Sequence, residues 1–171
     1  AETVSELSDC LNQLQRFNPK LNVIFTISPV RHLRDGVTEN NRSKARLIEA
    51  VHTLVQDLPR CYYFPAYELV IDVLRDYRFY DIDLAHPNYA ATRFVMDHFL
   101  EQLVHPDSRQ LSAEVHEIVI ARKHKPFQPL TSAHRKFLAS NAEKVRALMM
   151  RHPFLDLREE LSYFEGKASS E

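Results

Sequence analysis

LNVIFTI, residues 21–27, is a short apolar stretch, rich in β-branched and aromatic residues, that lies between Pro19 and Pro29. Such a run, bounded by helix breakers and too short for a helix, is typical of a strand buried on both faces of a parallel sheet. A second stretch, RCYYF at residues 60–64, has the same character and ends at Pro65. These two stretches predict the sheet around which the rest of the chain is organised.

Helical patterns flank both predicted strands. Apolar residues recur every three or four positions over residues 3–17 and again over residues 41–58, and the second of these helices links the two strands. Strand, helix and strand in this order form a crossover unit, so the sequence predicts an α/β fold with a parallel sheet covered by helices. Further helices are expected over residues 67–74 and 87–104, the latter with a proline in its first turn.

The pattern changes after residue 106. Three helical patterns then follow one another with no strand between them: residues 111–123, 132–151 and 154–164. We therefore divide the chain into an α/β part, residues 1–106, and a C-terminal helical extension, residues 107–171. The pattern leaves open whether this extension acts as a lid, an oligomer interface or a docking surface.

Charge and hydropathy limit the classes of function. The chain has 171 residues, with 22 Lys and Arg against 23 Asp and Glu, and a formal net charge of −1. A balanced charge provides no long-range field that attracts nucleic acid or a membrane surface. No apolar run approaches the roughly 18 residues that span a bilayer, and residues 1–9 lack the basic and apolar blocks of a signal peptide. We expect a soluble, cytoplasmic protein with no nucleic-acid partner and no membrane span.

Glycine and cysteine are both scarce. Only Gly36 and Gly166 occur, where average usage of about 7% predicts roughly a dozen glycines. The phosphate-binding patterns GxxxxGK[ST] and GxGxxG therefore cannot be formed, which excludes P-loop nucleotide binding and the standard dinucleotide fingerprint. The two cysteines, Cys10 and Cys61, have no metal-site or disulfide spacing and are predicted to be buried thiols. We expect no cofactor and no bound metal.

Asp83 and His86 form the strongest candidate site. A carboxylate three residues before an imidazole can accept from one ring nitrogen and leave the other free to take a proton from a nucleophile. With Pro87 in the first turn of a helix, the positive end of that helix favours the neutral imidazole that a general base requires. The spacing also fits a purely structural alternative, in which His86 caps the helix and Asp83 forms an ion pair with Arg78 or Arg93.

The segment Ser28-Pro-Val-Arg31-His32 is a second candidate, because it follows the first predicted strand. Open α/β sheets bind ligands at the carboxyl ends of their strands. Ser28 could donate to a substrate oxygen there, and Arg31 or His32 could contact an acidic group. A turn serine before a proline, with an exposed arginine and histidine, explains the same residues. Ser28 is a poor nucleophile candidate, because no glycine flanks it to permit the strained turn.

Residues 62–68 and 74–80 interleave tyrosine with arginine and acidic residues. A sugar-binding cleft often has this composition, since rings stack on sugars and charged groups bind hydroxyls. A long loop packed onto a sheet has it equally often. In that second interpretation Arg75, Asp76 and Arg78 are the internal ion pairs that hold the loop.

Two basic patterns have solvated alternatives. Residues 122–136 carry five Lys and Arg and no acidic residue, so they could contact phosphates, or they could form a solvated loop balanced by the acidic residues 156–165. Ser43 and Lys44 are neighbours in sequence and therefore do not face each other on a helix. We expect Asn41 or Ser43 to cap that helix and Lys44 to be solvated.

Five motifs occur in a fixed order along the chain: Thr26-Ile-Ser-Pro-Val-Arg-His32, Asn41-Arg-Ser-Lys44, Tyr63-Phe-Pro-Ala-Tyr-Glu68, Leu74-Arg-Asp-Tyr-Arg-Phe-Tyr80 and Asp83-x-x-His86-Pro87. Over roughly residues 10–104 they resemble the GSCFA family, which is named for a Gly-Ser-Cys-Phe-Ala motif near its start. That family is similar to the SGNH/GDSL hydrolases. Those enzymes have a flavodoxin-like three-layer fold and cleave esters, often on sugars, with a serine and an Asp-x-x-His pair. The resemblance also leads us to expect a bacterial protein.

The resemblance implies a role for each candidate residue. Asp83 is the orienting acid and His86 the base, while Ser28, Arg31 and His32 lie at the substrate-binding edge of the sheet. The implied substrate is a small-molecule or glycan ester. The chain contains no Gly-Ser-Cys-Phe-Ala motif, so it resembles the C-terminal half of the hydrolase domain without its nucleophile.

Apart from a nucleic-acid binder that uses residues 122–136, two functions stay open from the sequence. One is a portion of a serine ester hydrolase, which we expect to be inactive alone because a single oxyanion donor is worth about 3 to 4 kcal/mol and the donors around the nucleophile are missing. The other is a non-catalytic carbohydrate-binding or protein-interaction module with the same fold. In both, the strand at residues 21–27 is expected to expose an unpaired edge, through which the chain could form a homo-oligomer.

Overall fold

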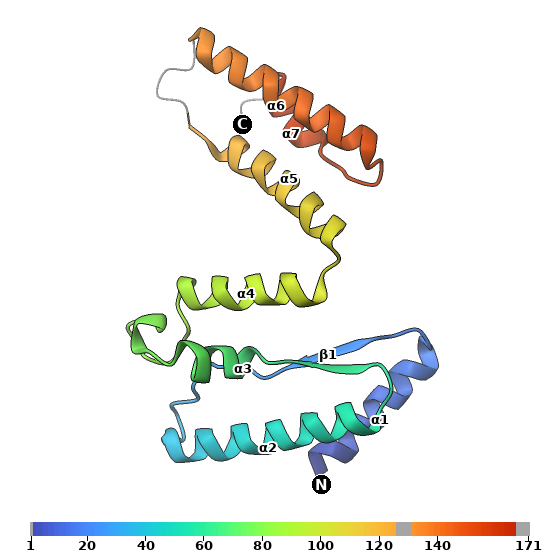
Figure 1. Ribbon diagram of the computed structural model, residues 1–171, viewed down its shortest axis with the longest axis vertical. Coiled ribbons are helices and arrows are strands. Elements are labelled where there is room, and N and C mark those ends of the chain that lie inside the picture. Colours follow the sequence, from blue (N-terminus) through green and yellow to red (C-terminus); the bar gives the residue numbers. More distant parts are fainter. Residues whose placement is uncertain (1, 126–130, 167–171) are drawn as a thin grey trace. The chain divides into compact units, whose positions relative to one another are not determined.

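The computed structural model describes residues 2–125 and 131–166. The chain forms two compact units, Ala1–Leu103 and Val104–Glu171, and each is described by itself. The first unit combines helices with a small parallel sheet and the second is helical (Figure 1). This confirms the prediction of an α/β fold with a helical extension.

Two strands form the sheet of the first unit. β1 (Val23–Thr26) and β2 (Cys61–Phe64) pair in parallel, with Val23 opposite Cys61. β1 is shorter than the predicted strand because Leu21 belongs to a turn that precedes it. Among the described residues the sheet has these two strands, so β1 and β2 each have one edge without a strand partner.

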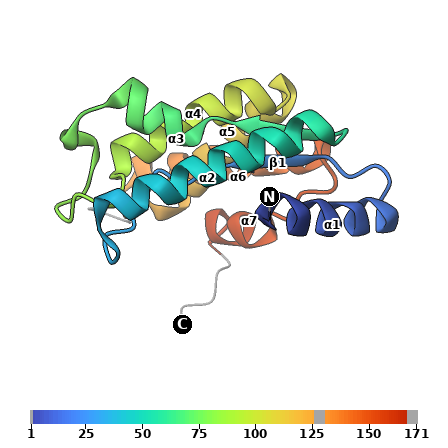
Figure 2. The same cartoon turned by 90° about the horizontal axis from the view of Figure 1, so that it is seen from below.

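Two helices cover one face of the sheet. α1 (Glu2–Phe17) and α2 (Gly36–Asp57) bring Leu11 and Leu54 against Cys61, and all three side chains are buried. The apolar stripe that predicted each helix is therefore the face that packs on the strands. Figure 2 shows α1 and α2 on this side of the sheet.

The fourth helix, α4 (Tyr89–Leu103), covers the opposite face. Phe99 packs edge-to-face on Phe64 of the sheet with their ring centroids 5.2 Å apart. The unit thus has a helix–sheet–helix layering. The prediction that this helix starts at Pro87 is wrong, because Asn88 caps it by accepting from the backbone amides of the first turn.

Three short helices connect β2 to α4: α3 (Ala66–Glu68), the π-helix η1 (Leu69–Leu74) and the 3-10 helix η2 (Tyr77–Phe79). Arg75 ends η1 in a left-handed backbone conformation, with φ at 51°. Asp76 caps η2 and pairs with Arg78 at 3.4 Å. The predicted ion pair between Asp76 and Arg78 is therefore present.

The second unit contains three helices in its described part: α5 (Pro106–Lys123), α6 (Ser132–Arg151) and α7 (Arg158–Phe164). Ile118, Val145, Leu148 and Phe164 lie at the centre of its core. α5 begins five residues before the predicted start, because His105 caps it through its ring nitrogen. No helix within residues 2–125 and 131–166 is both long and apolar enough to cross a membrane.

The two cysteines differ in burial. Cys61 is buried in the sheet, whereas Cys10 is exposed. The prediction of a buried Cys10 is wrong because Leu11, its neighbour on α1, takes the position that faces the core. One residue along a helix turns the side chain by about 100°.

Candidate functional site

Asp83 and His86 are in direct contact. His86 Nδ1 lies 2.6 Å from Asp83 Oδ2. Asp83 Oδ1 accepts from the backbone amides of Ala85 at 2.9 Å and His86 at 3.0 Å. These hydrogen bonds lower the pKa of Asp83 from 3.8 to about 2. The largest cause is the backbone amide of His86, followed by the amide of Ala85 and the imidazole of His86. An ionised carboxylate only accepts, so in the neutral imidazole the proton lies on Nδ1 and Nε2 has the free lone pair.

A closed loop holds this pair in place. The amide of Asp81 donates to His86 O at 2.8 Å, and the amide of Leu84 donates to Asp81 O at 2.9 Å. Tyr80 and Pro87 form an isolated antiparallel bridge at the base of the loop. Leu84 has φ at 55°, a left-handed conformation that costs a non-glycine residue about 1 to 2 kcal/mol. Strain of this kind persists where surrounding contacts fix the backbone, as they do here.

Arg31 contacts the loop through its backbone and its side chain. Its amide donates to Ala85 O at 3.0 Å, and its Nη1 donates to Leu84 O at 3.2 Å. The guanidinium carbon lies 4.5 Å from the ring centroid of Tyr80 and 5.1 Å from that of Tyr77. The contacts of Arg31 are thus with the loop that carries Asp83 and with η2, and its predicted contact with substrate stays a prediction.

Ser28 takes part in a turn. Its Oγ accepts from the amide of Val30 at 3.2 Å, which matches the turn serine considered from the sequence. Lys44 Nζ donates to Ser28 O at 2.6 Å, and burial lowers the pKa of Lys44. The expectation of a solvated Lys44 is wrong, because its side chain is partly buried and donates to the backbone of Ser28. The expectation that Asn41 or Ser43 caps the helix is also wrong, because α2 begins at Gly36. Within the described residues no hydrogen bond joins Ser28 to the Asp/His pair.

His32 belongs to a second histidine–aspartate pair. Its Nδ1 lies 3.2 Å from Asp35 Oδ2, and its amide donates to the buried Asn40 Oδ1 at 2.9 Å. The contacts of His32 are therefore with the start of α2. Across residues 2–125 and 131–166, no group of three or more His, Cys, Asp or Glu could hold a metal ion.

An apolar cavity of about 230 Å³ lies beside His86. Four segments build its walls: the turn after β1, the helices after β2, the loop that carries His86 and Pro87, and α4. They contribute Pro29, Val30, Ala66, Val70, Ala91 and Val95. The cavity lies where the chain leaves the carboxyl ends of both strands, which is the position at which open α/β sheets bind ligands.

Asn88 is a residue of this site that the sequence interpretation missed. Its Nδ2 donates to Arg78 O at 2.7 Å and to Tyr80 O at 3.3 Å, while its Oδ1 caps α4. It thus ties the loop to the helix that walls the cavity. A signal for it was present, because asparagine just before a helical pattern is a preferred cap.

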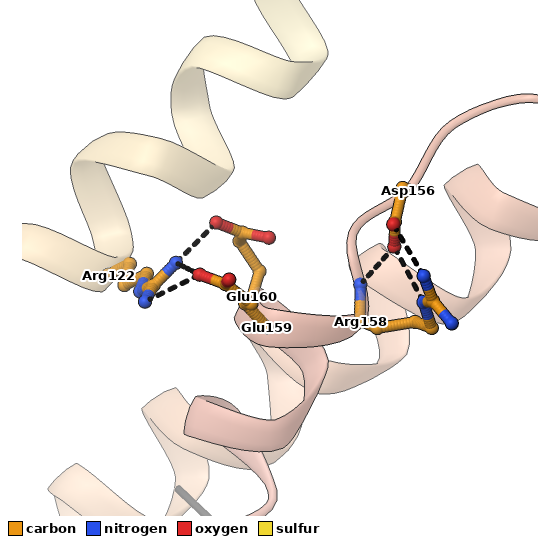
Figure 3. A network of polar contacts seen from close by, with 5 residues as sticks. All are labelled: Arg122, Asp156, Arg158, Glu159 and Glu160. Carbon is orange, nitrogen blue, oxygen red and sulfur yellow. Dashed lines mark hydrogen bonds and ion pairs between the residues drawn. The ribbon is translucent and has the colours of Figure 1, made fainter.

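The basic residues of the second unit are balanced by acidic ones. Arg122 Nη1 donates to Glu160 at 2.6 Å and to Glu159 at 3.3 Å (Figure 3). This confirms for Arg122 the expected balance with the acidic segment. Residues 126–130 of the basic stretch lie outside the described residues.

A parallel sheet between helical layers, with an Asp/His pair in the loop that follows its second strand, defines an α/β protein with a candidate acid–base site. Residues 1–99 match the model of the GSCFA family, and residues 115–169 match the model described as GSCFA domain protein, C-terminal domain. The chain belongs to the GSCFA family, which confirms the resemblance found in its motifs. No curated protein and no solved structure matches it significantly.

Proposed function

We propose that this chain provides the acid and the base of a serine ester hydrolase of the SGNH/GDSL type, which acts on a small-molecule or glycan ester. The observation that carries the proposal is the 2.6 Å contact between Asp83 Oδ2 and His86 Nδ1. Two backbone amides fix the carboxylate, so the imidazole is oriented before any substrate arrives. Such preorganisation lowers the cost of reaching the transition state.

The reaction needs Nε2 of His86 as the proton carrier. Nε2 takes the proton of a serine hydroxyl as its oxygen attacks the ester carbonyl, and then gives that proton to the leaving alcohol. Water next attacks the acyl-enzyme, with His86 again as base, and releases the carboxylic acid and the free serine. Asp83 stays ionised throughout and stabilises the imidazolium that forms twice.

The proposal places the serine outside this chain, since none of its serines lies in a Gly-Ser-Cys-Phe-Ala motif. The oxyanion donors that surround that serine would come with it. One such donor is worth about 3 to 4 kcal/mol, so the chain alone should not hydrolyse esters at a measurable rate above background.

Fluorophosphonate labelling tests this function, because the reagent reacts with a serine activated by a base. We expect it to label one serine of a longer polypeptide that carries these residues, and to leave the 171-residue chain of 20.0 kDa unlabelled. His86→Ala in the longer polypeptide should abolish labelling. A native protein whose intact mass is 20.0 kDa, or labelling that persists in His86→Ala, contradicts the proposal.

The second candidate is a non-catalytic carbohydrate-binding or protein-interaction module. It is favoured by two exposed aromatic side chains near the loop, Tyr77 at 62% and Tyr89 at 80% exposure, because sugar rings stack on exposed aromatic rings. Saturable binding of a glycan or a protein by the 171-residue chain, weakened in Tyr77→Ala and unchanged in His86→Ala, would support this function over hydrolysis.

The remaining expectations belong to the same proposal. We expect the protein to be cytoplasmic and bacterial, to bind no cofactor and no nucleic acid, and to form a homo-oligomer through the free edge of β1. The division of the chain into residues 1–106 and 107–171 also belongs here, and the change of compact unit at Leu103 and Val104 supports it.

A further inference from the structure

We infer that the cavity beside His86 binds the acyl chain of the ester and selects chains of about four to eight carbon atoms. This inference rests on the proposed function, because it names the group attached to the carbonyl on which His86 acts. It assigns a ligand chemistry to the cavity and a specificity to the walls.

The walls are apolar and fixed. Ala91 and Val70, which line the cavity, are 0% and 1% exposed, so their positions are set by the packing between the sheet and α4. Val30 and Val95 are partly buried and add branched aliphatic surface. Burial of a straight alkyl chain against such walls is favourable in proportion to the apolar area removed from water.

The cavity is poorly suited to a sugar. Apart from His86, the polar side chain in its lining is Thr92, whose hydroxyl already donates to Asn88 O at 2.6 Å. A sugar placed there would bury hydroxyl groups without hydrogen-bond partners, and each such group costs free energy. Because the alcohol part of a glycan ester is a sugar, the part of such an ester that fits this cavity is the acyl chain.

The volume of the cavity limits the length of the acyl chain that it can hold. A closed cavity of about 150 Å³ with aliphatic and aromatic walls holds benzene, a six-carbon molecule. The cavity beside His86 has about 230 Å³, and His86 belongs to its lining, so the carbonyl end of a bound acyl group would lie next to the imidazole. It therefore accommodates about four to eight carbons, and longer chains must project into solvent.

Methyl ketones test the inference without any nucleophile, because they carry a carbonyl on an alkyl chain and cannot be hydrolysed. The 171-residue chain, with labelled methyl groups, is titrated by NMR with a graded series from butanone to dodecanone. We expect the dissociation constant to fall about fourfold for each added methylene and then to level off near the eight-carbon ketone. The methyl resonances of Val30 and Val95 should shift on binding.

Two substitutions of Val30 change the cavity in opposite directions. Val30→Phe fills the cavity and should weaken the binding of the longer ketones at least tenfold. Val30→Ala enlarges the cavity, so the dissociation constant should level off only at longer ketones. Val73→Phe is the matched control, since Val73 is 61% exposed and lies outside the cavity lining. If Val30→Phe does not fold, the shift in Val30→Ala decides the question.

A dissociation constant that does not depend on chain length overturns the inference, as does an equal effect of Val30→Phe and Val73→Phe. The outcome is distinguishable from that of the proposed function. Ketone binding by the 171-residue chain, without fluorophosphonate labelling of the longer polypeptide, retains the acyl site and rejects the hydrolase. Labelling without chain-length dependence retains the hydrolase and rejects the acyl site.

Discussion

Asp83 in the first unit and Asp156 in the second are both exposed carboxylates whose pKa is lowered from 3.8 to about 2, for different reasons. For Asp83 the largest causes are hydrogen bonds from the backbone amides of His86 and Ala85. For Asp156 the largest cause is the side chain of Arg158, whose Nε and Nη2 donate at 2.8 and 2.7 Å (Figure 3).

This difference separates a site that can move a proton from one that cannot. The backbone holds Asp83 whatever the state of its partner, and its Oδ2 accepts from an imidazole that can gain and lose a proton. Asp156 is held by a guanidinium that stays charged at every relevant pH, so no proton moves in that pair. A lowered carboxylate pKa therefore indicates chemistry only together with the partner that it orients.

The largest expected effect is the loss of the base. In the polypeptide that fluorophosphonate labels, His86→Ala should lower kcat by about 10⁵- to 10⁶-fold, as expected when the proton carrier of a triad is removed. His32→Ala removes a histidine that also contacts an aspartate, at 3.2 Å, and should leave kcat within about threefold because the pair is exposed. Equal losses of kcat in steady-state assays of the two variants would show that His86 contributes no more to catalysis than His32.

The next effect tests the carboxylates themselves. Asp83→Asn should lower kcat by about 10⁴-fold, since an amide that donates to His86 Nδ1 selects the wrong tautomer. Asp156→Asn loses the same charge in a pair that moves no proton, so its kcat should be unchanged. Measurement of both variants over a range of pH is the check, and a fall in activity for Asp156→Asn contradicts the comparison.

A smaller effect is expected at Arg31. Arg31→Met removes the bond to Leu84 O and the contacts with the two tyrosine rings, which should lower the free energy of unfolding by about 1 to 2 kcal/mol. As a positioning residue it should lower kcat about tenfold with little change in KM. Arg31→Lys keeps the charge and should recover part of the loss.

Arg42→Met is the control for Arg31, because Arg42 forms an exposed pair with Glu39 at 2.7 Å and should change stability by less than about 0.5 kcal/mol. Urea unfolding and steady-state kinetics give the two readouts. An Arg31→Met variant with a raised KM and an unchanged kcat would instead support the substrate contact that the sequence predicted.

Local pattern explains what could be read from the sequence. Strand and helix alternation depends on residues close together in the chain, and the contact between Asp83 and His86 follows from a spacing of three. Both were therefore predictable. The helix start at Pro87 was misplaced by two residues, because proline in the first turn and asparagine at the cap are competing signals at adjacent positions.

The rest of the site depends on contacts between distant segments. Arg31 stacks on rings at positions 77 and 80, more than forty residues further along the chain, and the walls of the cavity come from four segments. No periodicity encodes such contacts. The left-handed backbone at Leu84 was equally invisible, since leucine carries no signal for positive φ.

The smallest effect, and the most direct test of the comparison, is a pair of carboxylate titrations by NMR. In Arg158→Gln the pKa of Asp156 should rise from about 2 toward 3.8, because its largest cause is removed. In His86→Ala the pKa of Asp83 should stay well below 3.8, because the backbone amides of residues 85 and 86 remain.

The same difference determines stability in acid. A carboxylate whose pKa is lower in the folded state stabilises the protein above pH 4, and this contribution is lost as the pH falls from about 4 through about 2. In Arg158→Gln, Asp156 should no longer contribute to this loss of stability in acid. In His86→Ala, Asp83 should still make most of its contribution. If His86→Ala instead returns the pKa of Asp83 to 3.8, the imidazole and not the backbone orders the loop. Asp83 and Asp156 would then be two examples of one kind of ion pair.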